Sequence, residues 1–253
     1  MSQQNNLASL AERLSSALKL EQAPVAIRFT DSIAAGVSGP ATRVPAGCRF
    51  WQDAVSSTFV TSASDHNLCA IGVHTHNLEP SASQQADLME ALRVFGELSY
   101  VRPQDVAAIP VLASRHKYVV YSPLSEAETT PDVVVVFVDA NQTLILSEAT
   151  QQVEGQTAPA MGRPACAAIP QVVNTGRAAL SLGCCGARAY LDVLTEGIAI
   201  FGIPGAKLPA YVERIEALSQ ANAILSKFHQ LRRRDVYAGK SPTIKESLGA
   251  MGA

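Results

Sequence analysis

The sequence predicts a single domain of mixed α/β class. Apolar residues make up 47% of the 253 residues and charged residues only 17%, which is typical of a chain with a well-filled core. Segments with the apolar spacing of helices alternate with segments rich in β-branched residues. Because no stretch resembles a long interdomain linker, we expect one compact domain over residues 1–237 and a frayed tail over 238–253.

The first part of the chain predicts three helices and two strands. Leucines recur at helical spacing over residues 5–20, and branched residues that follow a proline predict a strand at 24–29. A loop with several glycines and prolines comes next. After it we expect a short helix at 48–55, a strand at 58–61 and an amphipathic helix at 84–99.

The second part continues this alternation. Strands are expected at 117–122 and 132–138, and the latter is apolar throughout, as is typical of a strand buried on both faces. Asn141 is placed to cap a helix over 142–152. The remaining expected elements are a helix at 165–174, extended segments at 177–182 and 198–203, and a helix at 209–231 that begins with a proline.

A weak internal repeat organises four of the five cysteines. Cys48 and Cys69 are 21 residues apart, Cys166 and Cys184 are 18 apart, and each pair brackets a short helix, a turn and a strand. The repeat predicts two similar halves, each with the order strand–Cys–short helix–strand–Cys–helix. The halves are expected at about 21–100 and 117–231. Packing about a pseudo-twofold axis would bring the two cysteines of each half together; chance similarity is the alternative, because the two segments share little identity.

Four cysteines that arrive singly from separate loops indicate metal-ligand chemistry. Structural zinc sites usually contain close ligand pairs such as Cys-x2–4-Cys, and this sequence has none. An iron–sulfur cluster takes one thiolate per iron and suits such scattered ligands. We therefore expect Cys48, Cys69, Cys166 and Cys184 to hold a cluster, of 4Fe-4S type, with zinc on the same four ligands as the alternative.

Each of these cysteines has a cationic or potentially cationic neighbour within four residues. The neighbours are Arg49, His66, Arg163 and Arg188. Positive charge stabilises thiolates and a cluster that becomes more negative on reduction, so the three arginines are expected around the cluster. His66 follows Asp65, which can fix its tautomer, and it is the candidate proton donor for a bound substrate. A capped turn is the structural alternative for this pair.

Three further groups of cysteine, histidine and arginine residues contribute less to the predicted site. Cys185 adjoins Cys184, and adjacent cysteines do not easily ligate separate irons, so one of them is expected to be a spare thiol or a small buried residue. His74 and His76 would share a face on a strand and bind metal there, but a solvated loop is the more common setting. The arginines at 232–234 are expected to form a solvated face.

Several motifs carry a resemblance to a known family. They are Pro24–Phe29, Asp65-His66-Asn67-Leu68-Cys69, Tyr121-Ser122-Pro123-Leu124, Pro131-Asp132-Val133-Val134, Ser181-Leu182-Gly183-Cys184-Cys185-Gly186-Ala187-Arg188 and Gly202–Leu208. Over roughly residues 10–220 the chain resembles the prokaryotic domain-of-unknown-function family 169. The Asp-His…Cys and Ser-Leu-Gly-Cys elements of that family correspond to Cys69 and Cys184, which implies that Cys185 is the variable position. The family has no assigned reaction.

Composition and motifs disfavour several functional classes. A net charge of −2 gives no electrostatic reason to expect nucleic acid, and the longest apolar run, at 133–138, is too short to span a bilayer. Phosphate-binding glycine loops and the Gly-x-Ser-x-Gly hydrolase motif do not occur. With five cysteines and an N-terminus unlike a secretory signal, we expect reduced thiols and a cytoplasmic protein.

These observations predict an iron–sulfur redox protein that acts in electron transfer or as the redox partner of another protein. Four protein ligands leave no open position on the metal, which favours electron transfer over Lewis-acid catalysis. One alternative is a reductive enzyme that uses the cluster and His66 on a small-molecule substrate. The others are a structural zinc protein and a metal-free protein with a reactive thiol. The sequence leaves open whether the protein is an enzyme and what its oligomeric state is.

Overall fold

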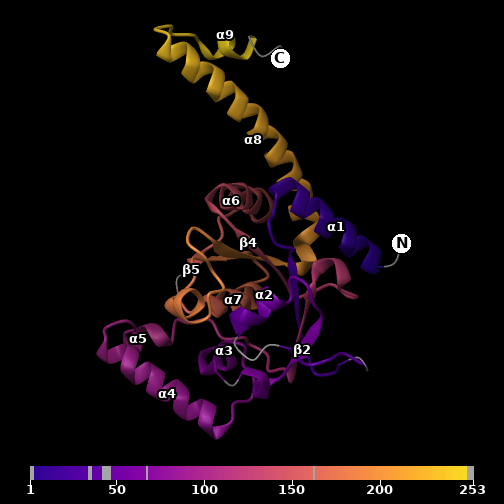
Figure 1. Cartoon of the computed structure of the whole chain (residues 1–253), viewed down its shortest axis with the longest axis vertical. Helices are drawn as coiled ribbons and strands as arrows, with labels where there is room; N and C mark the ends of the chain where they lie inside the picture. The colour runs from indigo at the N-terminus through magenta and orange to yellow at the C-terminus, as the bar shows by residue number, and fades with distance from the viewer. Residues whose placement is uncertain (1–2, 34–35, 42–46, 67, 162, 250–253) are drawn as a thin grey trace.

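A computed structural model describes residues 3–33, 36–41, 47–66, 68–161 and 163–249 of the chain. Within these residues the chain forms a seven-stranded sheet with helices on both faces, and one long helix projects well beyond the rest (Figure 1). The predicted mixed α/β class is therefore confirmed. Among the described residues, no helix is long and apolar enough to cross a membrane.

The sheet has the strand order β2-β3-β1-β4-β7-β6-β5. Its strands are β1 (Val25–Thr30), β2 (Phe59–Thr61), β3 (Tyr118–Pro123), β4 (Val133–Val138), β5 (Ala160–Met161), β6 (Ala179–Ser181) and β7 (Ala199–Pro204). The six strands expected from the sequence are present, with ends shifted by one or two residues. All neighbouring strands are antiparallel except β5 and β6. β1 and β4 pair at the centre, and β3 lies beside β1; the organisation into two similar halves stays a prediction.

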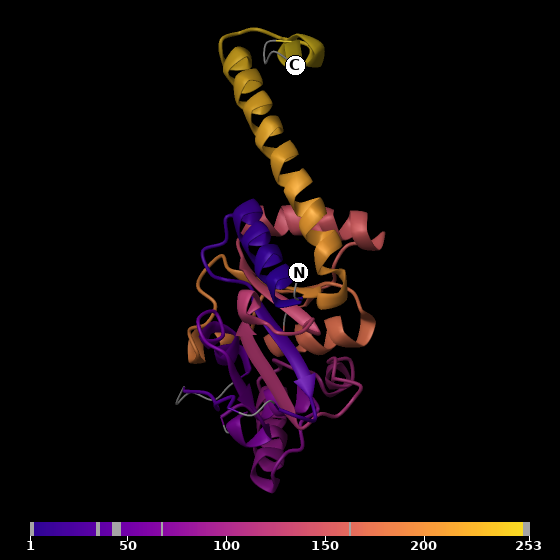
Figure 2. The same cartoon turned by 90° about the vertical axis from the view of Figure 1, so that its right-hand side faces the viewer.

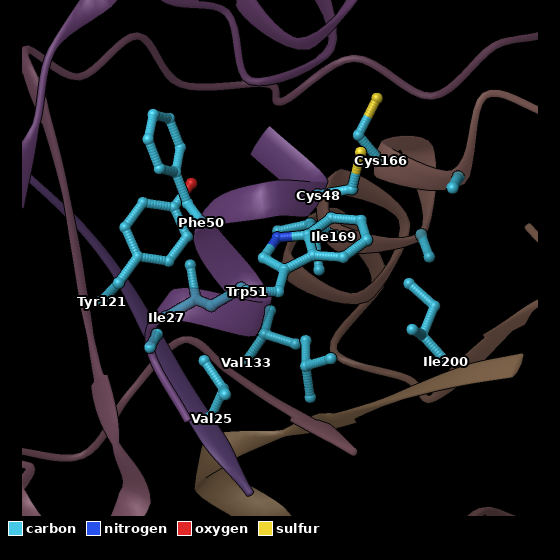
Figure 3. Close-up of a cluster of buried hydrophobic side chains, with 14 of the residues drawn as sticks. Val25, Ile27, Cys48, Phe50, Trp51, Tyr121, Val133, Cys166, Ile169 and Ile200 are labelled. Carbon is cyan, nitrogen blue, oxygen red and sulfur yellow. The ribbon is translucent and has the colours of Figure 1, made fainter. Parts of the chain in front are cut away.

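Alternate side chains of β4 enter two different cores. All six of its residues are buried, because side chains of a strand point to opposite faces in turn and helices cover both faces. The even-numbered residues pack with α1 (Gln3–Leu18), α6 (Ala140–Glu154) and the start of α8 (Leu208–Tyr237). The odd-numbered residues pack with α2 (Gly47–Asp53) and α7 (Ala168–Thr175) in a core that also contains Cys48 and Cys166. We call this second core the cysteine-side core (Figure 3).

The start of α6 differs from the prediction. Asp139, and not Asn141, is the N-cap: its carboxylate accepts a hydrogen bond from the Gln142 amide at 2.8 Å, and the Gln142 side chain accepts one from the Asp139 amide at 2.8 Å. This reciprocal capping box satisfies two amides that a helix leaves unpaired at its start. The helix therefore begins at Ala140, and Asn141 lies in its first turn.

Short helices fill several connections between the longer elements. On the side of the cysteine-side core, or beyond it, lie η1 (Ala63–His66), α3 (Ala70–Thr75), α5 (Pro103–Val106), η3 (Ala165–Ala167) and η4 (Gly186–Tyr190). The helices η2 (Leu124–Glu126) and η5 (Gly205–Lys207) adjoin the other core. The longer α4 (Ala82–Glu97) lies with α5 at the end of the molecule opposite the projecting helix (Figure 1). α3 was not expected from the sequence.

The last long helix, α8, leaves the body of the molecule. Its first turns are anchored by Leu208, Tyr211, Val212 and Ile215, which are buried against the sheet. The rest of the helix extends past the body as far as Tyr237 (Figure 2). A short helix, α9 (Ile244–Gly249), packs near its far end, within the segment that we expected to be frayed.

Candidate functional site

The four expected ligands come from four segments on the same side of the sheet. Cys48 lies in the first turn of α2, Cys69 is the N-cap of α3, Cys166 lies in η3, and Cys184 precedes η4. Cys48 and Cys166 are buried, whereas Cys69 and Cys184 are partly exposed and pack against the cysteine-side core. Figure 3 shows the side chains of Cys48 and Cys166 next to each other, above the ring of Trp51.

The four thiols form one electrostatic group. Burial raises the pKa of Cys48, Cys69 and Cys166, and the neighbouring thiols raise it further. The charges of Cys69 and Cys184 raise the pKa of Cys48, and that of Cys184 raises the pKa of Cys69. All three raise the pKa of Cys166, so every pair of the four thiols interacts. The thiols of Cys48, Cys69 and Cys166 are therefore protonated at neutral pH unless a cation compensates their charge.

Three of the four sulfurs also accept a hydrogen bond, from the Gly72 amide to Cys69 (3.3 Å), from Thr75 Oγ1 to Cys166 (3.3 Å) and from the Ala187 amide to Cys184 (3.5 Å). The backbone amides of Cys48 and Arg49 act on the Cys48 thiol, and that of Gly47 on the Cys69 thiol, in the direction that lowers the pKa. Most of these donors lie in the first turns of α2, α3 and η4, where amides lack a partner within the helix. Hydrogen bonds of this kind favour the thiolate form of a cysteine.

These thiols do not converge on one point. Among the described residues, no three His, Cys, Asp or Glu side chains are arranged to hold a single metal ion. A tetrahedral zinc site needs four ligand atoms at about 2.0–2.3 Å from one centre. The four sulfurs therefore lie in the same part of the molecule, but they do not surround one position that a single metal ion could occupy.

Two fully buried histidines lie near the thiols. The rings of His66 and His76 are 5.9 Å apart, and an added Cβ on Gly47, next to Cys48, would lie 3.2 Å from His76 Cε1 and 3.8 Å from His66 Cε1. His66 Nε2 is 3.3 Å from Thr61 Oγ1. Within the described part of the chain, His66 Nδ1 and both ring nitrogens of His76 have no hydrogen-bond partner. Burial lowers the pKa of His66 to about 4 and that of His76 to about 3, so both rings are neutral at pH 7.

The surroundings of these histidines correct two expectations. Asp65 accepts hydrogen bonds from the amide and hydroxyl of Ser62 at 2.8 Å, so it caps a turn, and the His66 ring instead forms a hydrogen bond with Thr61. His74 and His76 are separated by the helical geometry of α3 and do not share a face: His74 is exposed and His76 is buried. The solvated loop expected for this pair is therefore wrong for His76, and no local pattern in the sequence indicated its burial.

Two of the three neighbouring arginines contact side chains outside the group of thiols. Arg49 forms an ion pair with Asp53 on α2, with 3.1 Å between Nε and Oδ1. The guanidinium of Arg163 lies 3.8 Å from the centre of the Tyr100 ring. The Tyr100 hydroxyl in turn donates a hydrogen bond to Cys185 Sγ at 3.2 Å, and Cys185 is exposed.

Arg188 clamps the loop that carries Cys184. Its two terminal nitrogens donate hydrogen bonds to four backbone carbonyls. These belong to Leu194 (3.2 Å), Thr195 (2.7 Å), Leu182 (2.7 Å) and Ile198 (2.8 Å). The planar fork of an arginine suits several acceptors at once, which an ammonium group does not match. The observed role of Arg188 is thus to join the two ends of this loop.

Arg188→Lys is expected to lower the free energy of unfolding by about 2 kcal/mol, because lysine keeps the charge but cannot serve all four carbonyls. Chemical denaturation measures this change. Arg177→Lys, at an exposed position, is the matched control and should leave stability unchanged. Wild-type stability in Arg188→Lys would show that charge alone matters at this position.

Comparison with known proteins places the chain in one family. A family model, that of domain-of-unknown-function family 169 (DUF169), described as an uncharacterised ArCR, matches residues 13–214. No curated protein and no solved structure matches the chain. The matched range begins in α1, ends in α8 and includes the four grouped cysteines and both buried histidines. Because it covers well over half of the sequence, the chain belongs to the DUF169 family.

Proposed function

We propose that the protein binds an iron–sulfur cluster, of 4Fe-4S type, through Cys48, Cys69, Cys166 and Cys184, and that it transfers electrons to or from a redox partner protein. The proposal depends on one observation: four thiols from four distant segments interact pairwise, and the sulfurs of Cys69, Cys166 and Cys184 each accept a hydrogen bond. Amides and hydroxyls that donate to cluster sulfurs are a usual means of tuning its potential.

The chemistry of the thiols supports a cluster over the alternatives. A bound cluster supplies the positive charge that buried thiolates need, and it takes its ligands at separate irons. A single zinc ion fits less well, because no such ligands converge on one position in the described part of the chain. A reactive thiol needs a lowered pKa, whereas burial raises the pKa of Cys48, Cys69 and Cys166.

Electron transfer is the role that four protein ligands favour. A cluster held in this way supplies one-electron chemistry without an open iron position. Cys69 and Cys184 are partly exposed and Cys48 and Cys166 are buried, so the first two lie on the side that a partner protein reaches. We place such a protein in the cytoplasm, where reducing conditions keep its five cysteines free.

Anaerobic purification tests the proposal directly. We expect a brown protein with broad absorption near 400 nm, about four irons and four sulfides per chain, and a reversible one-electron reduction. Colourless protein with stoichiometric zinc would instead support the zinc site. Protein that takes up neither metal nor sulfide after anaerobic reconstitution would support the reactive-thiol alternative.

Gly72→Ala is expected to lower the iron content of the purified protein. The added Cβ would lie 3.0 Å from Cys69 Sγ and 3.6 Å from His66 Nδ1, so it displaces the sulfur from its place. Alanine otherwise favours a helix by about 1 kcal/mol over glycine, so helix propensity alone would act in the opposite direction. Gly96→Ala in α4 is the matched control, because its nearest contact would be 3.8 Å away; it should keep the full iron content. Equal iron content in both variants would contradict the placement of Cys69 as a ligand.

A second candidate function is a reductive enzyme that uses the cluster and His66. The observation that favours it is the pair of buried imidazoles beside the thiols, whose nitrogens include three that lack a hydrogen-bond partner among the described residues. A neutral imidazole can hold a proton at one nitrogen and release it to a substrate that takes up electrons. Consumption of a small-molecule substrate by the isolated protein with dithionite would support this function, and His66→Gln should then abolish turnover while it preserves the 400 nm absorption.

A further inference from the structure

Apart from Phe228 and the contact with α9 near its far end, the outer part of α8 is mostly exposed within the described residues. We call residues 219–249, which include this part and α9, the arm (Figure 2). Every residue from 220 to 227 is exposed, so α8 is surrounded by solvent for two full turns. Exposed residues there include Ile224 (57% exposed) and Leu225 (49% exposed). Isolated helices of this length are only marginally stable in water, so we expect this segment to be stabilised by a binding partner.

Charge is unevenly divided between the arm and the body. The arm contains six Lys and Arg against two Asp and Glu, a net charge of +4. The preceding 218 residues carry fourteen basic and twenty acidic residues, a net charge of −6. Three of the arm's charges adjoin each other at Arg232, Arg233 and Arg234, near its far end. The arm is therefore electrostatically complementary to the body of another copy.

A groove at the base of the arm offers a place for that contact. It lies between α1, the start of α6 and the first turns of the arm, and its volume is about 1210 Å³. A helix about 10 Å wide occupies roughly 420 Å³ per turn, so the groove accommodates about three turns. Its lining includes the exposed carboxylates of Glu12 and Glu21 together with the side chains of Lys19 and Lys227, while Glu216 is already paired with Arg13 at 2.7 Å.

We propose that the protein forms a homodimer in which the two arms lie antiparallel and the basic end of each arm occupies the groove of the other copy. A two-fold axis beside Ile224 and Leu225 buries these apolar side chains against their counterparts. It also places Arg233 opposite residue 216, at the level of the groove, because both are about nine residues from the axis. A parallel arrangement would instead bring two clusters of three arginines together. This inference does not depend on a metal centre.

The mass of the full chain in solution tests the proposal first. Sedimentation equilibrium should give twice 26.7 kDa, with a dissociation constant that rises steeply with salt. The double variant Ile224→Asp/Leu225→Asp should be monomeric. Met89→Asp replaces an equally exposed apolar residue on α4 and should remain dimeric. At 100 µM, about 10⁻⁴ M, even a weak homodimer is associated. A wild-type chain that is monomeric at this concentration would overturn the proposed dimer, also in the case that a different protein is the partner of the arm.

A charge exchange tests the antiparallel arrangement. One variant carries Arg232→Glu, Arg233→Glu and Arg234→Glu, and the other carries Glu12→Lys and Glu21→Lys. Each alone places like charges at both contacts and should dissociate at least about tenfold more readily than wild type. An equimolar mixture restores opposite charges at both contacts and should form the heterodimer. Far-ultraviolet circular dichroism verifies that both variants are folded. If the wild type dimerises but the mixture does not, the proposed arrangement is wrong.

Discussion

Cys184→Ser is expected to reduce bound iron from about four atoms per chain to about none, whereas Cys185→Ser keeps the full content. The two cysteines are adjacent in the sequence, but only Cys184 belongs to the group of interacting thiols. Its sulfur accepts a hydrogen bond from the Ala187 amide, in a loop that Arg188 holds in place. Cys185 is exposed and accepts from the Tyr100 hydroxyl.

Iron and sulfide assays together with absorption near 400 nm measure this difference. Because the two substitutions remove the same atom from neighbouring positions, each serves as the control for the other. Loss of iron in Cys185→Ser, with full content in Cys184→Ser, would assign the ligand to Cys185. Full iron content in both variants would contradict a four-cysteine cluster.

Acidification of the metal-free protein from pH 6.5 to 5 is expected to lower its free energy of unfolding by about 1–2 kcal/mol for each buried histidine. Burial lowers the pKa of His66 to about 4 and that of His76 to about 3, below the value near 6.5 of an unfolded chain. In this range the unfolded chain therefore binds protons that the folded chain does not. The stability that depends on keeping these two histidines neutral is fully present above pH 6.5. It is lost progressively as the pH falls toward the pKa values of the folded protein.

Urea denaturation at a series of pH values measures this slope. His76→Gln removes one titrating group and should reduce the slope by about half, although the variant itself is less stable. A slope in His76→Gln equal to that of the wild type would contradict the lowered pKa, because it would show that His76 binds protons equally in the folded and unfolded states.

Local patterns were sufficient to predict most helices and strands. The apolar run of β4 and the leucine spacing of α1 each reflect a face that must be buried, and burial follows a period that the sequence displays. The helix α3 was not predicted, because Gly72 and the branched residues around it disfavour a helix in isolation. The cap of α6 was misassigned because Asp139 and Asn141 are both good N-caps, and the pairing of Asp139 with Gln142 decided between them.

The cysteines of the candidate site were visible from their spacing, but their partners were not. Thr75 donates to Cys166 across 91 residues of sequence, and no local pattern encodes such a contact. The burial of His76 likewise results from packing against Phe29 and Gly47, from other segments of the chain. The carbonyls that Arg188 binds belong to a loop whose shape depends on that same arginine.

The pairing of β1 with β4 at the centre of the sheet has a consequence for the order of assembly. Val25 and Val135 are partners although 110 residues separate them, and the grouped thiols span the chain from Cys48 to Cys184. Contacts between residues so far apart slow folding, because long loops must close before the contacts form. Until then the thiols are separate and open to oxidation. Any metal centre at this site is therefore loaded late, after the chain has folded, which ties its maturation to a reducing environment during synthesis.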